Sequence, residues 1–302
     1  MTSASRLCLV VFSLGMFAAA PALWAQPVLR LEEDLDFDRP EAWALKYFSA
    51  VTQLTGLGVP ERLPAGAWVI GLEGGSLPHL SARERTVGFY GTKTEDLNKT
   101  PAFGRPRVTV GLPAALSLTL AYAPPLEIGG ARPSLLSLAL ARPLYEAESW
   151  RLGARLYGQI GKVKGDFTCP EDEARAGRDP VANPYLCERK SRDEATLRYW
   201  GFELGAAWTL GKAEPYFAAA INRLDPEFQV NAQYNGLLDR THQTTQGNTW
   251  SIQAGVGYQA REKLQLTAEL FYAPLTLVRT QGGTKEHQDL LNLRLMAAYR
   301  VR

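Results

Sequence analysis

Eight charged residues recur at alternate positions of predicted strands and are the main candidates for chemistry. Their neighbours on the same strand faces are glycine, small or polar residues, so these faces are expected to enclose a polar interior. Charges in such an interior either select ions in a water-filled pore or pair in a structural network. We favour the network, because side chains fill the interior of a narrow closed sheet. This lumen charge belt comprises Glu73, Arg107, Arg151, Arg155, Glu203, Glu269, Arg294 and Arg300.

The height of each residue along its strand predicts which charges meet. Counting from the strand ends places Glu269, Arg294, Glu73 and Arg107 at one level on successive strands. A second pair, Arg155 with Glu203, is expected on two strands joined by a long loop. Barrel stagger can slide such pairs by about two residues, so the direction of each side chain is the firmer prediction.

The three histidines, His79, His242 and His287, are the candidates for acid–base catalysis. All lie in predicted loops, and none belongs to a motif in which a nucleophile accompanies its base. The groups around His242 and His287 could converge at the rim of the fold. Histidines in loops are more often solvated, so we expect no enzymatic activity and no catalytic residue.

Two cysteines, Cys169 and Cys187, lie in one long predicted loop of an exported chain and are expected to form a disulfide. The acidic runs Glu171–Glu173 and Asp36–Asp38 could attract calcium, but their spacing does not form a cage. We therefore predict no metal site and no cofactor.

The elements that position these residues are clearest in the stretch Thr249–Val301. Trp250, Ile252, Ala254, Val256 and Tyr258 alternate with polar residues and glycine. Two further alternating runs follow, each after a polar break. Alternation over about ten residues indicates strands long enough to span a membrane, whereas strands of soluble sandwiches are usually about five or six residues.

The same pattern predicts an all-β fold, an antiparallel transmembrane β-barrel of about ten strands. Connections alternate between short and long, which is typical of outer-membrane barrels with short periplasmic turns. An even strand number is expected to leave both chain ends in the periplasm. The segment 84–92 could add strands, so twelve remains an alternative. The expected strands are 67–77, 104–112, 115–124, 133–142, 149–163, 195–209, 214–223, 248–259, 263–274 and 289–301.

The N-terminal part of the chain has a different character. Residues 1–25 combine a basic start, an apolar run and small residues, as in a cleaved signal peptide. Residues 26–66 form a separate segment with an amphipathic helix, for which Asp38 is the expected N-cap, Pro40 an early helical proline and Glu41 the capping-box carboxylate. That helix either plugs the barrel or packs under its periplasmic mouth, and the second alternative is slightly favoured. The barrel occupies residues 67–302.

The alternating strands and the final run Leu295–Arg302 resemble the bacterial outer-membrane β-barrel superfamily. The run Arg107–Pro113 and the strand end Ala123–Pro125 resemble, weakly, barrels that transport small hydrophobic solutes. The resemblance implies an outer-membrane location, contact with its lipid and insertion by the barrel-assembly machinery. A net charge of +2, from 33 basic and 31 acidic residues, gives no reason to expect nucleic acid as a partner.

Three functions are compatible with this sequence. The first is a narrow, porin-like channel or transporter for small solutes, including hydrophobic ones. The second is a structural or surface-binding barrel that uses its long outer loops. The third, a rim-site enzyme, has the least support, because no catalytic motif accompanies the histidines.

Overall fold

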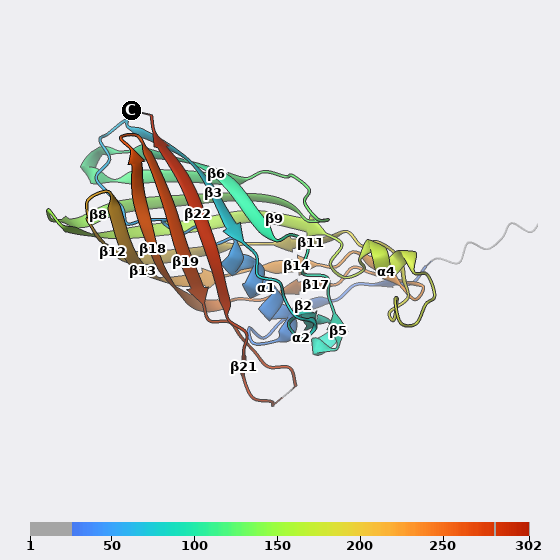
Figure 1. Ribbon diagram of the computed structural model, residues 1–302. Coiled ribbons are helices and arrows are strands. Elements are labelled where there is room, and N and C mark those ends of the chain that lie inside the picture. Colours follow the sequence, from blue (N-terminus) through green and yellow to red (C-terminus); the bar gives the residue numbers. More distant parts are fainter. Residues whose placement is uncertain (1–25, 281, 302) are drawn as a thin grey trace, which may run out of the picture.

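A computed structural model describes residues 26–280 and 282–301. Ten antiparallel strands form a closed barrel, because each pairs with the next along the wall and the last pairs with the first (Figure 1). The predicted ten-stranded barrel is confirmed, whereas the predicted signal peptide, residues 1–25, lies outside the described residues. The wall strands are β3 (Trp68–Ser76), β6 (Ala102–Gly111), β7 (Ser117–Ala123), β8 (Arg132–Glu146), β9 (Trp150–Gly165), β12 (Tyr199–Trp208), β13 (Ala213–Leu224), β18 (Gly247–Arg261), β19 (Leu264–Ala273) and β22 (Leu290–Arg300).

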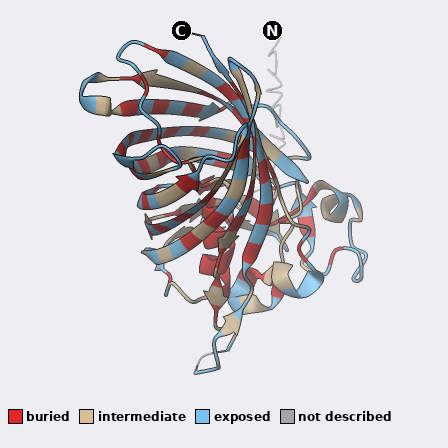
Figure 2. Cartoon of the chain, turned by 60° about the vertical axis from the view of Figure 1, so that its left-hand side comes forward, coloured by how far each residue is buried: buried red, intermediate tan, exposed pale blue. Residues whose placement is uncertain are grey.

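Burial alternates along every wall strand, as the bands of colour in Figure 2 show. On β8, Leu136, Leu138 and Leu140 are exposed on the outside of the barrel, whereas Ser137 and Ala139 between them are buried inside. The outer surface is therefore apolar and the interior mixed or polar, the reverse of a water-soluble barrel. None of the helices in the described ranges is long and apolar enough to cross a membrane.

The two ends of the barrel differ in the length of their connections. At the short-turn end the strands are joined by 112–116, 147–149, 209–212 and 262–263. At the long-loop end they are joined by 77–101, 124–131, 166–198, 225–246 and 274–289. The segment 84–92, considered above as an extra wall strand, instead contributes to α2 (Ala82–Arg85), β4 (Thr86–Val87) and α3 (Gly88–Gly91) within the first long loop.

The long loops have secondary structure of their own. The short strands β11 (Asp193–Thr196), β14 (Glu227–Gln229), β17 (His242–Thr244) and β2 (Glu32–Asp34) continue the sheet beyond β9. A separate four-stranded sheet has the strand order β1 (Val28–Leu29), β16 (Leu237–Asp239), β15 (Ala232–Tyr234) and β10 (Cys187–Arg189). The remaining elements are β5 (Lys93–Thr94), a 3-10 turn (Pro113–Ala115), α4 (Glu171–Arg175), β20 (Thr276–Leu277) and β21 (Glu286–His287).

The N-terminal segment runs through the barrel instead of packing beneath it. Residues 26–38, the N-terminal arm, pair through β1 and β2 with strands of the loop 225–246. Helix α1 (Pro40–Val51) then contacts β20 and β22 near the long-loop end. Residues 52–64, the lumen strap, continue from the helix to the short-turn end, where Gly66 bonds to Gly111.

This path corrects two expectations. The helix does not lie under the periplasmic mouth, because polar side chains along the barrel interior bind the lumen strap that follows it. The two ends of the described chain also lie at opposite ends of the barrel, since the arm pairs with long-loop strands and Val301 bonds to Trp68 at the short-turn end. Helix α1 begins with Pro40 after Arg39 as N-cap, and Asp38 bonds to Thr276 instead of capping it.

Candidate functional site

A cluster of buried charges crosses the barrel at mid-height. Six of the eight predicted belt residues are at least nine-tenths buried and therefore point inward: Glu73, Arg107, Arg155, Glu203, Glu269 and Arg294. Arg151 is half-buried nearer the short-turn end. Arg300 is exposed and pairs with Glu61 at the short-turn end, so its inclusion in the belt was wrong. Its strand ends there, where the wall no longer encloses the side chain.

Glu73 is bound most closely by Arg105, which the predicted belt did not include. Arg105 donates from Nε and Nη2 to the two carboxylate oxygens of Glu73, at 3.1 and 2.8 Å. The predicted partner Arg107 is farther away, with Nη1 at 3.5 Å from Glu73. The β3–β6 register explains the correction, because it places Glu73 opposite Arg105 and Gly71 opposite Arg107. A two-part hydrogen bond of this kind fixes both the distance and the plane of the pair.

Glu269 and Arg294 face each other in the β19–β22 register, as predicted, but each binds the lumen strap. Glu269 accepts hydrogen bonds from the Thr55 hydroxyl at 2.6 Å and from the Tyr216 hydroxyl at 2.9 Å. Arg294 donates to the backbone carbonyl of Gln53 at 2.7 Å and to that of Ala50 at 3.0 Å. Arg294 and Arg105 therefore both satisfy the buried Gln53 carbonyl of the strap, and Arg294 adds a donor to the Ala50 carbonyl at the end of α1.

The opposite wall holds the lower half of the strap. Arg155 pairs with Glu203 at 2.5 Å and faces it in the β9–β12 register. The Arg155 guanidinium lies against Gly56, where an added Cβ would be 2.1 Å from its Nη1. Arg151 donates to the Val59 carbonyl at 3.3 Å and also pairs with Glu214. Contacts from several strands thus hold the strap, and the lumen is occupied at this height.

Helix α1 is fixed at the long-loop end by a buried lysine. Lys46 Nζ donates to the Thr276 carbonyl at 2.6 Å and lies 3.7 Å from Asp38. Burial lowers the pKa of Lys46 to about 8, and the Asp38 carboxylate opposes this shift. Trp43 Nε1 also donates to the Gln288 carbonyl, at 3.2 Å. The helix is therefore tied to the loop 274–289 by two side chains.

An apolar cavity of about 210 Å3, the loop cavity, lies at the long-loop end. We call α1 and the lumen strap together the plug. The N-terminal arm, α1 and the loops 77–101, 166–198 and 225–246 surround the loop cavity. Five aromatic rings line it, those of Phe48, Phe89, Tyr90, Phe167 and Phe228. A cavity of about 150 Å3 lined by aliphatic and aromatic side chains can hold benzene, so the loop cavity has room for a single-ring molecule.

The outer wall of the loop cavity is a strained turn. Phe89 and Tyr90 have positive φ angles of 48° and 60°, which are uncommon for non-glycine residues. The Tyr90 backbone N–H donates to Glu41 Oε1 at 2.7 Å, and its ring lies 3.8 Å from the Arg39 guanidinium. The start of α1 therefore holds this turn against the cavity.

A second apolar cavity of about 110 Å3, the wall cavity, adjoins the first. The two share the side chains of Phe48, Leu97 and Phe167 as lining residues. The wall cavity reaches the barrel wall between β6 and β7, because residues of both strand ends line it, among them Phe103 and Pro124.

The strand pairing of β6 and β7 ends where the wall cavity begins. Their register stops at the pair Arg107–Ala121, although β6 continues to Ala102 beside β3 and β7 continues to Ala123 beside β8. Pro106 is the next residue of β6 and has no N–H to donate, which explains part of the break. The wall thus has a gap in its hydrogen-bond ladder next to an apolar cavity.

The remaining predicted candidates lie at the long-loop end. His242 Nδ1 is 2.7 Å from Glu32 and its Nε2 is 3.6 Å from Glu227, whereas His287 lies 3.9 Å from Asp289. Within the described part of the chain, no hydrogen bond or ion pair joins these histidines to each other. His79 is exposed near Asn98. Of the acidic runs, Glu171 pairs with Arg175 and Lys190, and Asp38 pairs with Lys46 and Lys285.

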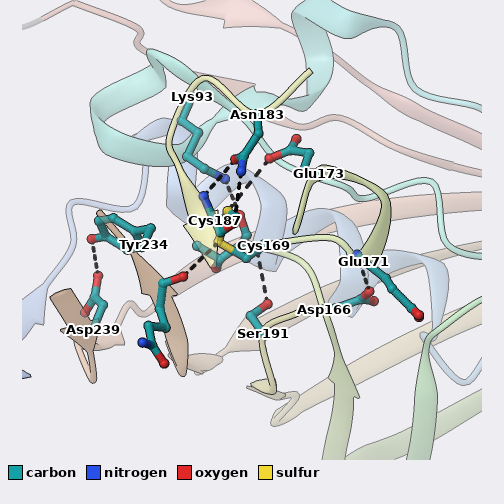
Figure 3. Close-up of a disulfide and its surroundings, with 12 residues drawn as sticks. Lys93, Asp166, Cys169, Glu171, Glu173, Asn183, Cys187, Ser191, Tyr234 and Asp239 are labelled. Carbon is teal, nitrogen blue, oxygen red and sulfur yellow. Dashed lines mark hydrogen bonds between the residues drawn. A yellow bond between two sulfur atoms is a disulfide. The ribbon is translucent and has the colours of Figure 1, made fainter. Parts of the chain in front are cut away.

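Cys169 and Cys187 form the predicted disulfide within the loop 166–198. Figure 3 shows Lys93, Glu173 and Asn183 gathered around it. Asn183 accepts a hydrogen bond from the Cys187 N–H at 2.7 Å and donates to the Cys187 carbonyl at 2.9 Å. The disulfide therefore fixes a loop whose side chains reach back to the first long loop, from which Lys93 comes.

Comparison with known proteins gives distant likenesses. No family model and no curated protein matches the chain. Among solved structures, the outer-membrane protease OmpT from Escherichia coli has 9% identity and a TM-score of 0.41, with 78% of this chain and 94% of that chain covered. The strand pairing described above, and not these likenesses, establishes the barrel.

Two toluene transporters are also similar to the chain. TodX from Pseudomonas putida has 12% identity and a TM-score of 0.32, with 90% of this chain and 78% of that chain covered. TbuX from Ralstonia pickettii has 9% identity and a TM-score of 0.29, with 80% of this chain and 90% of that chain covered.

Proposed function

We propose that the protein is a bacterial outer-membrane barrel that transfers small apolar solutes from the long-loop side into the membrane. An outer-membrane location is supported by the apolar outer surface of the wall strands. Soluble proteins rarely expose so large a continuous apolar surface to water. The immediate partners of this protein are then membrane lipid, the barrel-assembly machinery and the solute. The transfer requires no cofactor or catalytic group, and we propose no enzymatic role.

The observation that carries this proposal is the pair of adjoining apolar cavities that ends at the gap between β6 and β7. A solute in the loop cavity is separated from the wall cavity by Phe48, Leu97 and Phe167, whose side chains line both spaces. Movement of these side chains would join the two cavities. Arg105 also lines the wall cavity, where its two hydrogen bonds to Glu73 hold it.

The direct route to the short-turn end is less favourable for an apolar solute. The lumen strap and the buried charge cluster occupy the middle of the barrel, and both are held by hydrogen bonds. On the far side of the strap, the cavity of about 130 Å3 is lined by Arg107, Arg151, Arg155 and Glu214 among others. An apolar molecule would have to displace the strap and then cross a charged space, at a desolvation cost that the sideways route avoids.

The proposal is tested by uptake of a labelled single-ring hydrocarbon into intact cells whose outer membrane limits entry. Cells that carry the protein should show a faster initial rate than cells with an empty vector. The variant Phe48→Trp tests the route, because it enlarges a side chain that lines both cavities and should therefore slow uptake. Equal rates with and without correctly inserted protein would refute the transfer function.

A surface-binding role is the second candidate, and one observation favours it. The sheet of β1, β16, β15 and β10 belongs to the long-loop end and exposes Val28, and Leu186, just before β10, is also exposed. Shortening the tip of the disulfide loop should then abolish a cell-surface interaction without changing solute uptake, whereas the transport proposal predicts no lost interaction.

A further inference from the structure

The loop cavity is lined by the carboxyl group of Glu95, which its neighbours only half satisfy. Glu95 Oε2 accepts a hydrogen bond from Lys93 Nζ at 2.7 Å. Among the described residues, no donor reaches Glu95 Oε1. Glu95 lines the cavity, and its side chain is 13% exposed. We propose that this cavity binds a small apolar molecule carrying one ammonium group, with Glu95 Oε1 as the acceptor, and this proposal uses the cavity on which the proposed function rests.

The chain makes room for this oxygen at the cavity wall. Gly88 also lines the cavity, and a Cβ added there would lie 2.0 Å from Glu95 Oε1. A larger residue at position 88 would therefore push the carboxyl group from its place. Gly88 directly precedes Phe89, so Oε1 lies against the start of the turn that carries one of the aromatic rings of the lining.

The charges that line the cavity favour a cation over an anion. Four acidic residues and one basic residue line it, namely Glu33, Glu41, Glu95, Asp239 and Arg39. An anionic ligand would meet this excess of carboxylates in an apolar space, where like charges repel strongly. A cation would also gain from the aromatic rings, whose faces attract positive charge.

The other carboxylates of the lining each accept at least one hydrogen bond. Glu41 pairs with Arg39 at 2.9 Å, and Glu33 accepts a hydrogen bond from Gln243 at 2.9 Å. Asp239 accepts from the Tyr234 hydroxyl at 2.8 Å and from the backbone N–H of Thr241 at 2.8 Å. Glu33 and Glu95 thus each accept at one oxygen, whereas both oxygens of Glu41 and of Asp239 are engaged. Of these two, Glu95 is the one whose other oxygen lies against Gly88 in the cavity lining.

The Lys93 ammonium does not take the place of such a ligand. Lys93 is 1% exposed and does not line the cavity. Its Nζ also donates to the Thr168 carbonyl at 2.5 Å and lies 5.2 Å from the Tyr185 ring. Figure 3 shows it directed toward the disulfide loop. These contacts hold the lysine behind the cavity wall and leave Oε1 to the ligand.

The test compares three single-ring probes of similar size, benzylamine, benzyl alcohol and benzoate, by calorimetry on the full-length protein in detergent at pH 8. Benzylamine should bind about tenfold more tightly than benzyl alcohol, the expected gain from one hydrogen bond between charged groups. Benzoate should bind most weakly. Benzoate binding as tightly as benzylamine, or no preference between amine and alcohol, would overturn the proposal.

Two variants assign the preference to one carboxyl group. Glu95→Gln keeps the shape of the side chain and should remove the preference for benzylamine while benzyl alcohol binds as before. Glu33→Gln changes another carboxylate of the lining and should keep most of the preference. If Glu95→Gln does not fold, the order of affinities of the three probes for the wild-type protein still tests the preference for an ammonium group. Amine binding without hydrocarbon uptake would refute only the transfer function, and uptake without amine preference would refute only this inference.

Discussion

Glu269 and Arg294 stand opposite each other on neighbouring strands, yet both hold the same residue of the lumen strap. Thr55 donates its hydroxyl proton to Glu269 at 2.6 Å, and Arg294 lies 3.3 Å from the same hydroxyl oxygen. The Arg294 guanidinium also lies over the Phe271 ring, 3.9 Å from its centroid. The wall charges therefore hold a separate stretch of chain in the lumen, and that stretch covers both side chains.

Replacing Arg294 by alanine should loosen the plug. The change removes the positive charge opposite Glu269 and leaves the carbonyls of Gln53 and Ala50 with fewer partners, and a hydrogen bond to a charged group typically contributes about 1.5–3 kcal/mol. We expect a lower unfolding temperature, measured by the heat-dependent gel shift of the barrel. In planar bilayers the wild-type protein should be almost non-conducting, and Arg294→Ala should open more often.

Arg300→Ala is the matched control on the same strand. Arg300 pairs with Glu61 at the exposed short-turn end, where an ion pair contributes about 0–1 kcal/mol. Its unfolding temperature and conductance should therefore stay close to those of the wild type. Equal effects of the two substitutions would show that the buried position of Arg294 does not matter.

The pair of Glu73 and Arg105 should be strongly coupled in folding. A double-mutant cycle with Glu73→Gln and Arg105→Met should give a coupling energy of about 2 kcal/mol, because the two side chains share two hydrogen bonds. The same cycle with Arg107→Met should give a smaller value, since that contact is 3.5 Å. A larger coupling with Arg107 would contradict the register of β3 and β6.

Much of the barrel could be predicted from the sequence, because the membrane requires each wall strand to alternate. The period of two also fixed which way Glu73, Arg107 and Arg294 point. Arg105 could have been found by the same rule, since it lies two residues before Arg107 and shares its face. Its pairing with Glu73 required the barrel stagger, which alternation alone does not specify.

The plug and the cavities could not be predicted in the same way. The lumen strap has no periodic pattern, and its path depends on contacts with residues far along the chain, such as the one between Thr55 and Glu269. The N-terminal arm is placed by pairing with the loop 225–246, to which no local signal points. Glu95 and Phe228 meet in the loop cavity for the same reason, because they come from separate loops.

The disulfide should protect its loop more than it stabilises the barrel. Closing a loop of this length contributes about 3 kcal/mol in the chain-entropy model, and less where the loop is already ordered. Changing both Cys169 and Cys187 to serine should speed proteolysis between residues 166 and 198 while the barrel keeps its unfolding temperature. Thiol labelling of the unreduced wild-type protein should be negative, and stoichiometric labelling would contradict the bridge.

Binding of an amine in the loop cavity should strengthen as the pH rises through 7. Burial raises the pKa of Glu95 to about 7, with Asp193 and Glu173 adding to the shift and Lys93 opposing it. Below pH 7 the carboxyl group is protonated and uncharged, whereas above it the carboxylate attracts an ammonium ion that is still protonated. Benzylamine affinity should therefore increase from pH 6 to pH 8, and benzyl alcohol affinity should change little. A falling amine affinity over this range would contradict the role of Glu95.

The sideways route is tested most directly by filling the wall cavity and measuring hydrocarbon uptake by intact cells. Ala131 is 8% exposed and lines this cavity, so Ala131→Phe should fill it, at a folding cost of about 1–3 kcal/mol. Leu138→Phe on the lipid-facing side of β8 is the control. With equal amounts of inserted barrel, Ala131→Phe should reduce the rate to that of cells without the protein, and Leu138→Phe should leave it unchanged. Wild-type uptake by Ala131→Phe would contradict transfer through the gap between β6 and β7.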